Sequence, residues 1–512
     1  MCSTRKVSSL RKDMNKKYTS KQIIDFIRQK KEPFWLKERE RRALALFHRA
    51  AEGVPAYKDF LAKNRIQHEK VKTWQDFQLV PPVSKKNYLQ QYPLEMLCWG
   101  GTLERQITFS ATSGSTGEPF YFPRNEKLEF ENSSLSELFL KNVDSDLGGG
   151  CLLINCLGMG VWIGGLITYK TFDMAARRAN YPLSIINPGV NKHEIFNALR
   201  KLAPKFKRVI ICAYPPFLKD LIDNAAAEGI DLKKLNLRLL TAAEAFTENF
   251  RDYLAEKTGI KNVLLDTCNI YGTADIGAMA YELPAAILIR RLAVENGRLF
   301  SGLFSSSYKT PTLANYNPLF VTFEAPNGEI LITGDSVLPL VRHSVGDSGG
   351  VLSMGEVLRI TKDCGIDLQD EAERNGIREH LYSLPFVYVY ERRDLSVKLY
   401  GATVYPEFVK EALIEEQAER FVTGKFTMQV LYDEKQDQYL QISVEMKPCI
   451  EGTKMIEREL EGCVLRNLIS KSSEYRNNHG SLGEKVVPRI VLLPYEHPDY
   501  FCPGAKQKWV RA

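Results

Sequence analysis

The chain contains 512 residues, 44% of them hydrophobic and 26% charged. This composition excludes a disordered chain and, at this length, predicts two or more globular domains. The net charge of +7 comes from residues 1–31, where ten Lys and Arg face two Asp and leave −1 for the remainder, so the body is nearly neutral and no nucleic-acid partner is expected. The basic N-terminal arm itself is either a solvated tail or a contact for an acidic partner, a nucleic acid or anionic lipid.

Cysteine usage and hydropathy indicate the cellular compartment in which the protein is expected. The ten cysteines include no C-x-x-C pair, and the seven histidines do not fall among them at ligand spacing. This pattern argues against a disulfide framework and a structural zinc site, and it favours a reducing, cytoplasmic location. No apolar run is long enough to cross a bilayer, and the N-terminus lacks the apolar core of a signal peptide, so no membrane partner is expected. The sequence does not predict an oligomeric state.

In chain order, the charged, helix-forming sequence over 21–49 comes first and predicts a helical cap within residues 1–100. From about 105 to 350, apolar strand-like runs alternate with amphipathic helical ones, which predicts βαβ units and a largely parallel sheet. The strand-like runs start at Cys151, Arg208 and Leu237, and the helix-like runs cover 192–202, 216–228 and 247–258. A strand-like run over 328–333 and a turn over 338–342 indicate a more β-rich section after them.

After Val387 the pattern changes to a smaller α+β unit of roughly a hundred residues. Strand-like and helix-like runs succeed one another there at 396–400, 406–415, 426–432, 438–446, 453–469 and 486–493. We place the boundary near 391–395, which gives an N-terminal domain over 1–390 and a C-terminal domain over 391–512. The predicted fold class is α/β: a large domain with mixed or parallel sheets and flanking helices, and a small α+β domain.

Residues 112–119 read T-S-G-S-T-G-E-P, a loop rich in hydroxyl groups and glycine. Its glycines let main-chain N–H groups approach an anion, and its hydroxyl side chains add donors. It is not a Walker loop, because no Gly-Lys-Ser/Thr follows at the required spacing. On composition it is either an ordinary surface loop or a phosphate-binding loop formed by Thr112, Ser113, Gly114, Ser115, Thr116 and Gly117.

Four further segments follow this loop. They read A-A-E-A-F over 242–246, N-I-Y-G-T-A-D over 269–275, L-P-L-V-R-H-S-V-G-D over 338–347, and R-R-D over 392–394, seven residues before G-A-T-V-Y-P. Their order and spacing resemble G-A-E-x, Y-G-x-T-E, P-l-x-R-Y-x-x-G-D and G-R-x-D-D of the adenylate-forming acyl-CoA synthetase superfamily. Within it, the chain resembles the phenylacetate–CoA ligase branch, including its relatives in capsule-biosynthesis clusters. The resemblance runs from about residue 70 to the C-terminus.

The resemblance implies ATP as a substrate and Mg²⁺ as a cofactor. It assigns the ATP phosphates to the loop over 112–117 and Mg²⁺ to Asp275. Asp347 would accept hydrogen bonds from the ribose hydroxyls, and Arg392 would approach the ribose or the α-phosphate. The remaining adenine- and ribose-binding residues would be Ala243, Glu244, Tyr271, Gly272 and Thr273. Within 269–275, two positions depart from the pattern: Ala274 stands where it has threonine, and Asp275 where it has glutamate.

The C-terminal residues 503–510, P-G-A-K-Q-K-W-V, resemble the terminal lysine motif of the same superfamily, with Ala505 at its glycine position. The resemblance implies that Lys506 and Arg392 are catalytic, with Lys508 as the second choice for the lysine; a plain basic tail is the alternative. It also implies that the small domain is a mobile lid that turns about Asp394. Trp162 and Tyr214 would form an apolar wall of the acyl pocket, or else belong to the core.

The resemblance therefore implies an acid–thiol ligase that converts a carboxylic acid and ATP to an acyl-adenylate, releases pyrophosphate and transfers the acyl group to coenzyme A. The acid would be aromatic, such as a phenylacetate-like acid, or otherwise apolar. Two alternatives stay open. One is an adenylating enzyme whose acceptor is an amine or a carrier-protein thiol; the other is a degenerate nucleotide-binding scaffold, which the alanines at 274 and 505 would suit.

Overall fold

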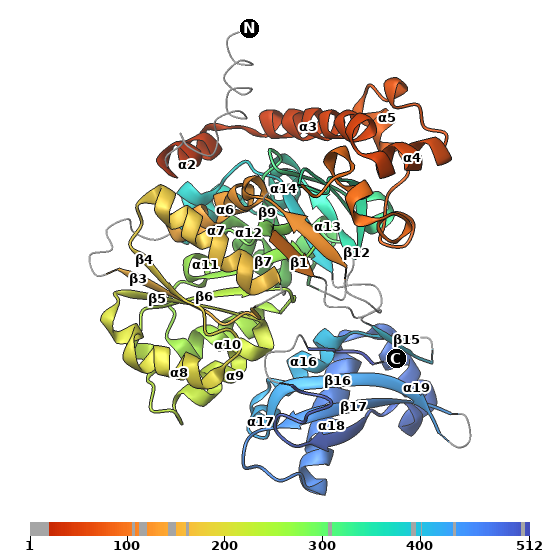
Figure 1. The fold of residues 1–512 in the computed structure, drawn as a ribbon. Helices are drawn as coiled ribbons and strands as arrows, with labels where there is room; N and C mark the ends of the chain where they lie inside the picture. Colours follow the sequence, from red (N-terminus) through yellow and green to blue (C-terminus); the bar gives the residue numbers. More distant parts are fainter. Residues whose placement is uncertain are drawn as a thin grey trace.

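The computed structural model describes residues 20–104, 108–111, 120–141, 150–159, 163–305, 310–390, 396–400, 402–433, 437–502 and 507–511. They form a large body and, below it in Figure 1, a small body made by the chain after residue 396. The architecture is the predicted α/β class. The predicted boundary at 391–395 lies outside the described residues and stays a prediction.

One 11-stranded sheet runs through the large body. Its strand order is β10 (Val321–Glu324), β11 (Glu329–Gly334), β12 (Leu340–Leu352), β13 (Phe386–Tyr390), β9 (Thr312–Tyr316), β8 (Gly277–Tyr281), β7 (Thr267–Thr273), β6 (Leu237–Ala242), β5 (Arg208–Ala213), β3 (Cys151–Asn155) and β4 (Leu183–Ile186). The pairs from β7 to β4 are parallel, whereas every pair from β7 to β10 is antiparallel. The parallel half and the β-rich half follow the predicted order along the chain.

Helices cover both faces of the parallel half, because its strands are apolar on both sides. On β5, Ile210 packs in a core with α6 (Glu126–Lys141) and α7 (Ile163–Ala179), whereas its neighbour Ile211 packs in a core with α8 (Lys192–Lys201) and α9 (Pro215–Ala225). The helices predicted over 192–202, 216–228 and 247–258 are confirmed as α8, α9 and α10 (Glu248–Thr258). The other helices of this body are α11 (Val263–Asp266), α12 (Pro284–Glu295), α13 (Gly297–Leu303), α14 (Met354–Asp363) and α15 (Leu368–Arg374).

The predicted helix over 21–49 is divided into α2 (Ser20–Gln29) and α3 (Glu32–Gly53). The break falls before Pro33, whose ring restricts the preceding residue and is tolerated only in a first turn. The helices α4 (Pro55–Lys63) and α5 (Trp74–Gln78) follow. Phe47 of α3 and Phe77 of α5 pack in one core with Ile332 of β11, so this helical region lies against the antiparallel half of the sheet.

The turn predicted over 338–342 is wrong for 340–342, where β12 begins. The chain does not reverse there. Instead Arg342 takes a left-handed φ of 49°, and the pairing of β11 with β12 shifts register between Ile332 and Gly334. Val83 forms two hydrogen bonds with the other edge of β12. The Val83 N–H donates to Arg342 O at 3.1 Å, and Val83 O accepts from Ser344 N at 2.8 Å. Residues 340–342 therefore belong to a bulged strand and not to the predicted turn.

The small body has a core of its own, which includes Phe426, Leu440, Val464 and Trp509. Its sheet consists of β16 (Val422–Tyr432), β17 (Gln438–Met446) and β18 (Arg489–Leu493), beside the hairpin of β14 (Val397–Leu399) and β15 (Ala402–Val404). Its helices are α16 (Pro406–Leu413), α17 (Glu416–Glu419), α18 (Lys454–Lys471) and α19 (Ser473–Leu482). The sequence did not predict α19, whose first turn is capped by Ser472.

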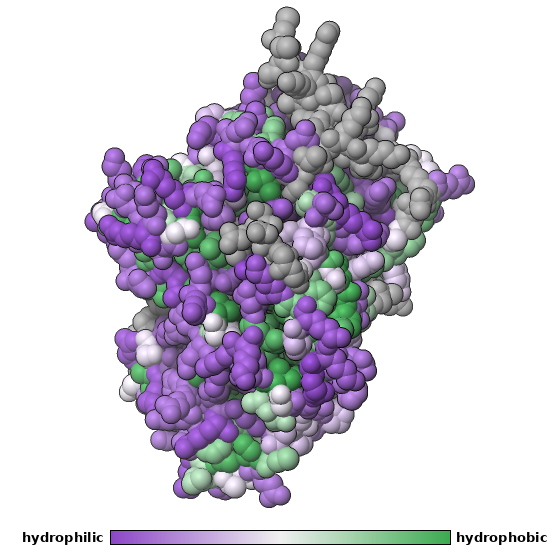
Figure 2. All heavy atoms as spheres, turned by 90° about the vertical axis from the view of Figure 1, so that its left-hand side faces the viewer, coloured by the Kyte–Doolittle hydropathy of each residue, from purple (hydrophilic) through white to green (hydrophobic). Residues whose placement is uncertain are grey.

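No described helix is both long and apolar enough to cross a membrane. Figure 2 shows one face of the molecule, on which hydrophilic side chains predominate and hydrophobic ones appear in smaller patches between them.

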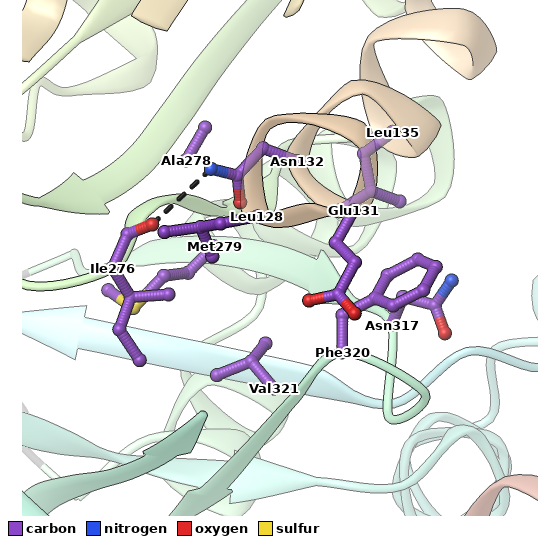
Figure 3. Close-up of a pocket in the computed structure, with 10 residues that line it drawn as sticks. All are labelled: Leu128, Glu131, Asn132, Leu135, Ile276, Ala278, Met279, Asn317, Phe320 and Val321. Carbon is purple, nitrogen blue, oxygen red and sulfur yellow. Dashed lines mark hydrogen bonds between the residues drawn. The ribbon is translucent and has the colours of Figure 1, made fainter. Parts of the chain in front are cut away.

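A buried carboxyl group on α6 predicts a measurable pH dependence of stability. Figure 3 shows the Glu131 side chain directed into a small hollow beside Phe320 and Asn317, and burial raises its pKa from 4.5 to about 7. Because the folded state favours the protonated form, the stability that Glu131 contributes is fully present below pH 4.5 and is lost as the pH rises through about 7.

Glu131→Gln is therefore expected to raise the free energy of unfolding at pH 8 by roughly 3 kcal/mol, which corresponds to the shift in pKa, and to change it little at pH 4.5. Urea unfolding at the two pH values measures this difference. The exposed Glu126 on the same helix supplies the matched control, since Glu126→Gln replaces no buried carboxyl and should change the free energy of unfolding little. Equal effects of Glu131→Gln at both pH values would contradict the prediction.

Candidate functional site

Two of the predicted nucleotide segments meet through their side chains. Tyr271 lies on β7 and Asp347 on β12, and the Tyr271 hydroxyl donates to Asp347 Oδ2 at 2.7 Å. The Tyr271 ring also packs near Phe323 of β10, with 6.1 Å between ring centroids. Because a carboxylate has several acceptor positions, this contact orients Asp347 and leaves it capacity to accept from other hydroxyl groups.

The third segment begins where β6 ends. Ala243 has a left-handed φ of 73°, which turns the chain out of the sheet, and the Asn269 side chain of β7 donates to Glu244 O at 3.1 Å. This turn therefore lies at the carboxyl ends of parallel strands, where open α/β sheets bind ligands. The Glu244 side chain is buried and accepts from Trp509 Nε1 at 3.1 Å, so it also contacts the small body.

The C-terminal residues are anchored to the small sheet. Met428 N donates to Trp509 O at 2.8 Å, and Gln507 Nε2 donates to Phe426 O at 2.8 Å. Trp509 is buried, whereas Lys508 is exposed. Lys506 lies outside the described residues, but the segment that follows it reaches the predicted adenine segment through the hydrogen bond between Trp509 and Glu244.

Asp275, the predicted metal ligand, lies between β7 and β8 and is buried. Its Oδ1 is 3.0 Å from His343 Nε2. Burial alone would raise the pKa of the Asp275 carboxyl, but the hydrogen bond with His343 and the positive charge of Lys85 outweigh it and lower the pKa. Neither His343 nor Lys85 was predicted from the sequence as a residue of this site. His343 falls inside the segment 338–347, whereas nothing local to Lys85 indicates a role.

The side chains around Asp275 fit a magnesium ion held together with a nucleotide. Among the described residues, no group of three or more His, Cys, Asp and Glu could hold a metal ion without other ligands. Mg²⁺ in nucleotide sites is usually bound by one or two carboxylates together with phosphates and water. An ionised Asp275 with one oxygen engaged by His343 can supply one such ligand through the other oxygen.

Several predicted site residues lie outside the described residues, namely 112–117, Trp162, Arg392, Asp394 and Lys506. The ends of the loop over 112–119 are nevertheless held by the hairpin of β1 (Thr108–Ala111) and β2 (Tyr121–Arg124), in which Ala111 pairs with Tyr121. Ser110 Oγ on this hairpin lies 3.5 Å from Ala274 O. The hairpin therefore brings the start of the loop close to the segment that carries Tyr271 and Asp275.

The remaining predicted residues lie on or near β7. Gly272 pairs with Ala278 of β8, and a Cβ atom at Gly272 would lie 2.5 Å from Gly277 O, so close strand pairing explains this glycine. Thr273 ends β7 and is partly buried. Tyr214 precedes α9, and its hydroxyl lies beside Gly164 in the first turn of α7. Burial raises the pKa of Tyr214.

No protein-family profile matches the chain. Phenylacetate-coenzyme A ligase from Pseudomonas putida is 23% identical over 313 residues, which are 60% of this chain and 64% of that protein. The match thus spans less than two thirds of the relative's length.

Among solved structures, 2-hydroxyisobutyryl-CoA ligase in the postadenylation state has a TM-score of 0.62 at 13% identity, covering 92% of this chain and 88% of that one. The AtGH3.15 acyl acid amido synthetase has a TM-score of 0.58 at 12% identity, covering 96% and 94%. The chain has the adenylate-forming fold. The resemblance inferred from the sequence segments is therefore confirmed at the level of the fold.

A partly buried ion cluster joins the two bodies. Lys425 Nζ of β16 lies 2.6 Å from Asp220 Oδ2 of α9 and 2.9 Å from Glu445 Oε2 of β17. Lys192 of α8 lies 2.5 Å from Glu496 Oε1. Burial raises the pKa of Asp220, which the positive charges of Lys425 and Lys192 oppose. We call these five residues the interdomain ion cluster.

Asp220→Ala is expected to loosen the docking of the small body, because it leaves the buried Lys425 with one carboxylate instead of two. Removing one member of a buried, hydrogen-bonded ion pair across an interface costs roughly 2–5 kcal/mol. Small-angle scattering should show a larger radius of gyration, and limited proteolysis should become faster. Asp173→Ala, which removes an ion pair with the exposed Arg177, is the control and should change neither. An unchanged radius for Asp220→Ala would contradict the prediction.

Proposed function

We propose that the protein is an ATP-dependent enzyme that joins a carboxylic acid to AMP and then transfers the acyl group to coenzyme A. The observation that supports this most directly is the convergence of distant segments on the adenylate-forming fold. Tyr271 contacts Asp347 across 76 positions of sequence, and Glu244 contacts Trp509 across 265. These contacts bring together four of the segments that the sequence resemblance assigns to nucleotide binding and catalysis.

The first proposed step activates the carboxylate, which is a poor electrophile because resonance and negative charge repel a nucleophile. A carboxylate oxygen attacks the α-phosphorus of ATP, the bond from that phosphorus to the oxygen of the β-phosphate breaks, and pyrophosphate leaves. Asp347 would fix the ribose through its carboxylate, and Asp275 would bind Mg²⁺, which offsets phosphate charge. The ammonium group of Lys506 would stabilise the charge that develops on the transferring oxygens.

In the second proposed step, the sulfur of coenzyme A attacks the acyl carbon, the thiol proton is lost, and AMP leaves as the carbon–oxygen bond breaks. The match to a phenylacetate-coenzyme A ligase supports this acceptor, and it also supports an aromatic or otherwise apolar acid. The position of Tyr214 beside Gly164 is compatible with an apolar acyl pocket.

An amine acceptor is the second candidate. The likeness to an acyl acid amido synthetase covers 96% of this chain, slightly more than the likeness to the CoA ligase. With an amine, the nitrogen would attack the same acyl carbon and the product would be an amide. A carrier-protein thiol would react as coenzyme A does.

The experiment that tests the proposal is ATP–pyrophosphate exchange with purified protein, Mg²⁺ and a panel of carboxylic acids, in the absence of any acceptor. We expect aromatic or apolar acids to promote exchange, which the first step requires. Adding coenzyme A or amines to the active acid then identifies the acceptor by the thioester or amide formed. If ATP binds and no acid in the panel promotes exchange, the nucleotide-binding scaffold becomes the better interpretation.

A further inference from the structure

Two departures from the superfamily pattern contact each other. Asp275 stands where the pattern has glutamate, and His343 stands where it has tyrosine. In the fold, their side chains are 3.0 Å apart, between His343 Nε2 and Asp275 Oδ1. The residues are 68 positions apart in sequence, so this contact exists only in the folded chain.

The backbone of β12 is held on both edges at His343. On one edge His343 pairs with Ile332 of β11, and on the other it forms a parallel bridge with Val83. The imidazole has an exposed fraction of 1% and the Asp275 side chain one of 9%. A buried ring on a doubly paired strand has few alternative rotamers, so His343 offers Asp275 a fixed partner.

The tautomer of His343 follows from its surroundings. Nδ1 is buried without a hydrogen-bond partner in the described part of the chain. An N–H at Nδ1 would be a buried donor without a partner, which is costly. An ionised carboxylate only accepts, so Nε2–H is the donor in the contact with Asp275 Oδ1. One carboxylate oxygen is thereby engaged by His343, and the second oxygen is the one that a cation can approach, with the Thr273 side chain also acting on this carboxyl.

We propose that His343 is a positioning residue that holds Asp275 in a single orientation and presents one carboxylate oxygen to the Mg²⁺ of MgATP. This inference rests on the proposed function, because it takes Asp275 as the metal ligand. The shorter aspartate reaches less far than glutamate would, and the hydrogen bond to His343 restricts its two side-chain torsions. The hydrogen-bonded partners of metal ligands commonly change affinity 10- to 100-fold when they are removed.

The test measures ATP affinity by titration calorimetry, once with Mg²⁺ and once with EDTA. His343→Leu places an apolar side chain at this buried position and removes the donor, whereas His343→Gln keeps an N–H donor. We expect His343→Leu to weaken MgATP binding about tenfold or more while the affinity for metal-free ATP changes less than about twofold. His343→Gln should restore most of the loss, and so should the double variant Asp275→Glu, His343→Tyr, which installs both residues of the pattern.

His380 supplies a matched control, because it is also a buried histidine whose Nδ1 has no partner in the described residues. His380→Leu should leave both affinities unchanged, and thermal unfolding checks that each variant is folded. Equal losses of both ATP affinities in His343→Leu, or no loss, would overturn the inference. If His343→Leu does not fold, MgATP affinity is measured in His343→Gln and in the double variant. A tenfold loss of MgATP affinity relative to wild type in both variants would overturn the inference.

The outcomes for wild type separate this inference from the proposed function. If wild-type protein binds ATP equally well with and without Mg²⁺, the inference is overturned even when acids promote exchange. If Mg²⁺ strengthens ATP binding and His343→Leu abolishes that gain, the inference stands even when no acid promotes exchange.

Discussion

Lys506→Ala is expected to lower the rate of ATP–pyrophosphate exchange by about 100- to 1000-fold and to leave the affinity for ATP nearly unchanged. A positively charged donor aimed at charge that develops in the transition state accounts for rate factors of about this size. The neighbouring residues support the assignment, because Trp509 is buried in the small body and hydrogen bonds to Glu244 of the large one. The anchored segment would carry Lys506 to the nucleotide segment when the small body is docked.

Lys508→Ala is the matched control for this prediction. It removes the same charge two residues away, from a side chain that is exposed, and it should change exchange less than about twofold, as surface substitutions usually do. Exchange is measured at saturating ATP, and ATP affinity is measured separately by calorimetry. If Lys508→Ala abolishes exchange and Lys506→Ala does not, the catalytic lysine has been assigned to the wrong residue.

Asp347→Ala is expected to weaken ATP binding roughly 10- to 100-fold. Hydrogen bonds to a charged group contribute about 1.5–3 kcal/mol each, and the proposed ribose contact would lose at least one of them. The same variant also removes the acceptor of the Tyr271 hydroxyl, which lies 2.7 Å from Asp347 Oδ2. Calorimetric titration with ATP measures the change in affinity.

Tyr271→Phe serves as the control, because it removes only the hydroxyl that orients Asp347. We expect a loss of a few-fold, in keeping with roughly 1 kcal/mol for one hydrogen bond. ATP analogues that lack one ribose hydroxyl give an independent comparison: they should bind wild-type protein more weakly than ATP, whereas Asp347→Ala should not distinguish them from ATP. Wild-type affinity in Asp347→Ala would remove Asp347 from the ribose site.

The sequence by itself determined the class of fold and most of the elements. Alternating apolar runs and amphipathic helices predicted the parallel half of the sheet, and β3, β5, β6, α8, α9 and α10 lie within a few residues of the predicted limits. This works because burial on both faces of a parallel strand, or on one face of a helix, leaves a periodic local pattern. The predicted turn was wrong at 340–342. These residues pair with Val83 and with β11 and form a bulged strand instead.

Only the tertiary structure decided which side chains of the candidate site meet. Tyr271 with Asp347, Glu244 with Trp509, and Asp275 with His343 are pairs from different strands, turns or bodies. The sequence named four of these six residues, and the other two, Trp509 and His343, lie inside segments that it identified. Local periodicity, however, carries no information about contacts across a sheet or between bodies. Sheet register, the bulge in β12 and the buried charges around Asp220 set those contacts, and each depends on residues far apart in the chain.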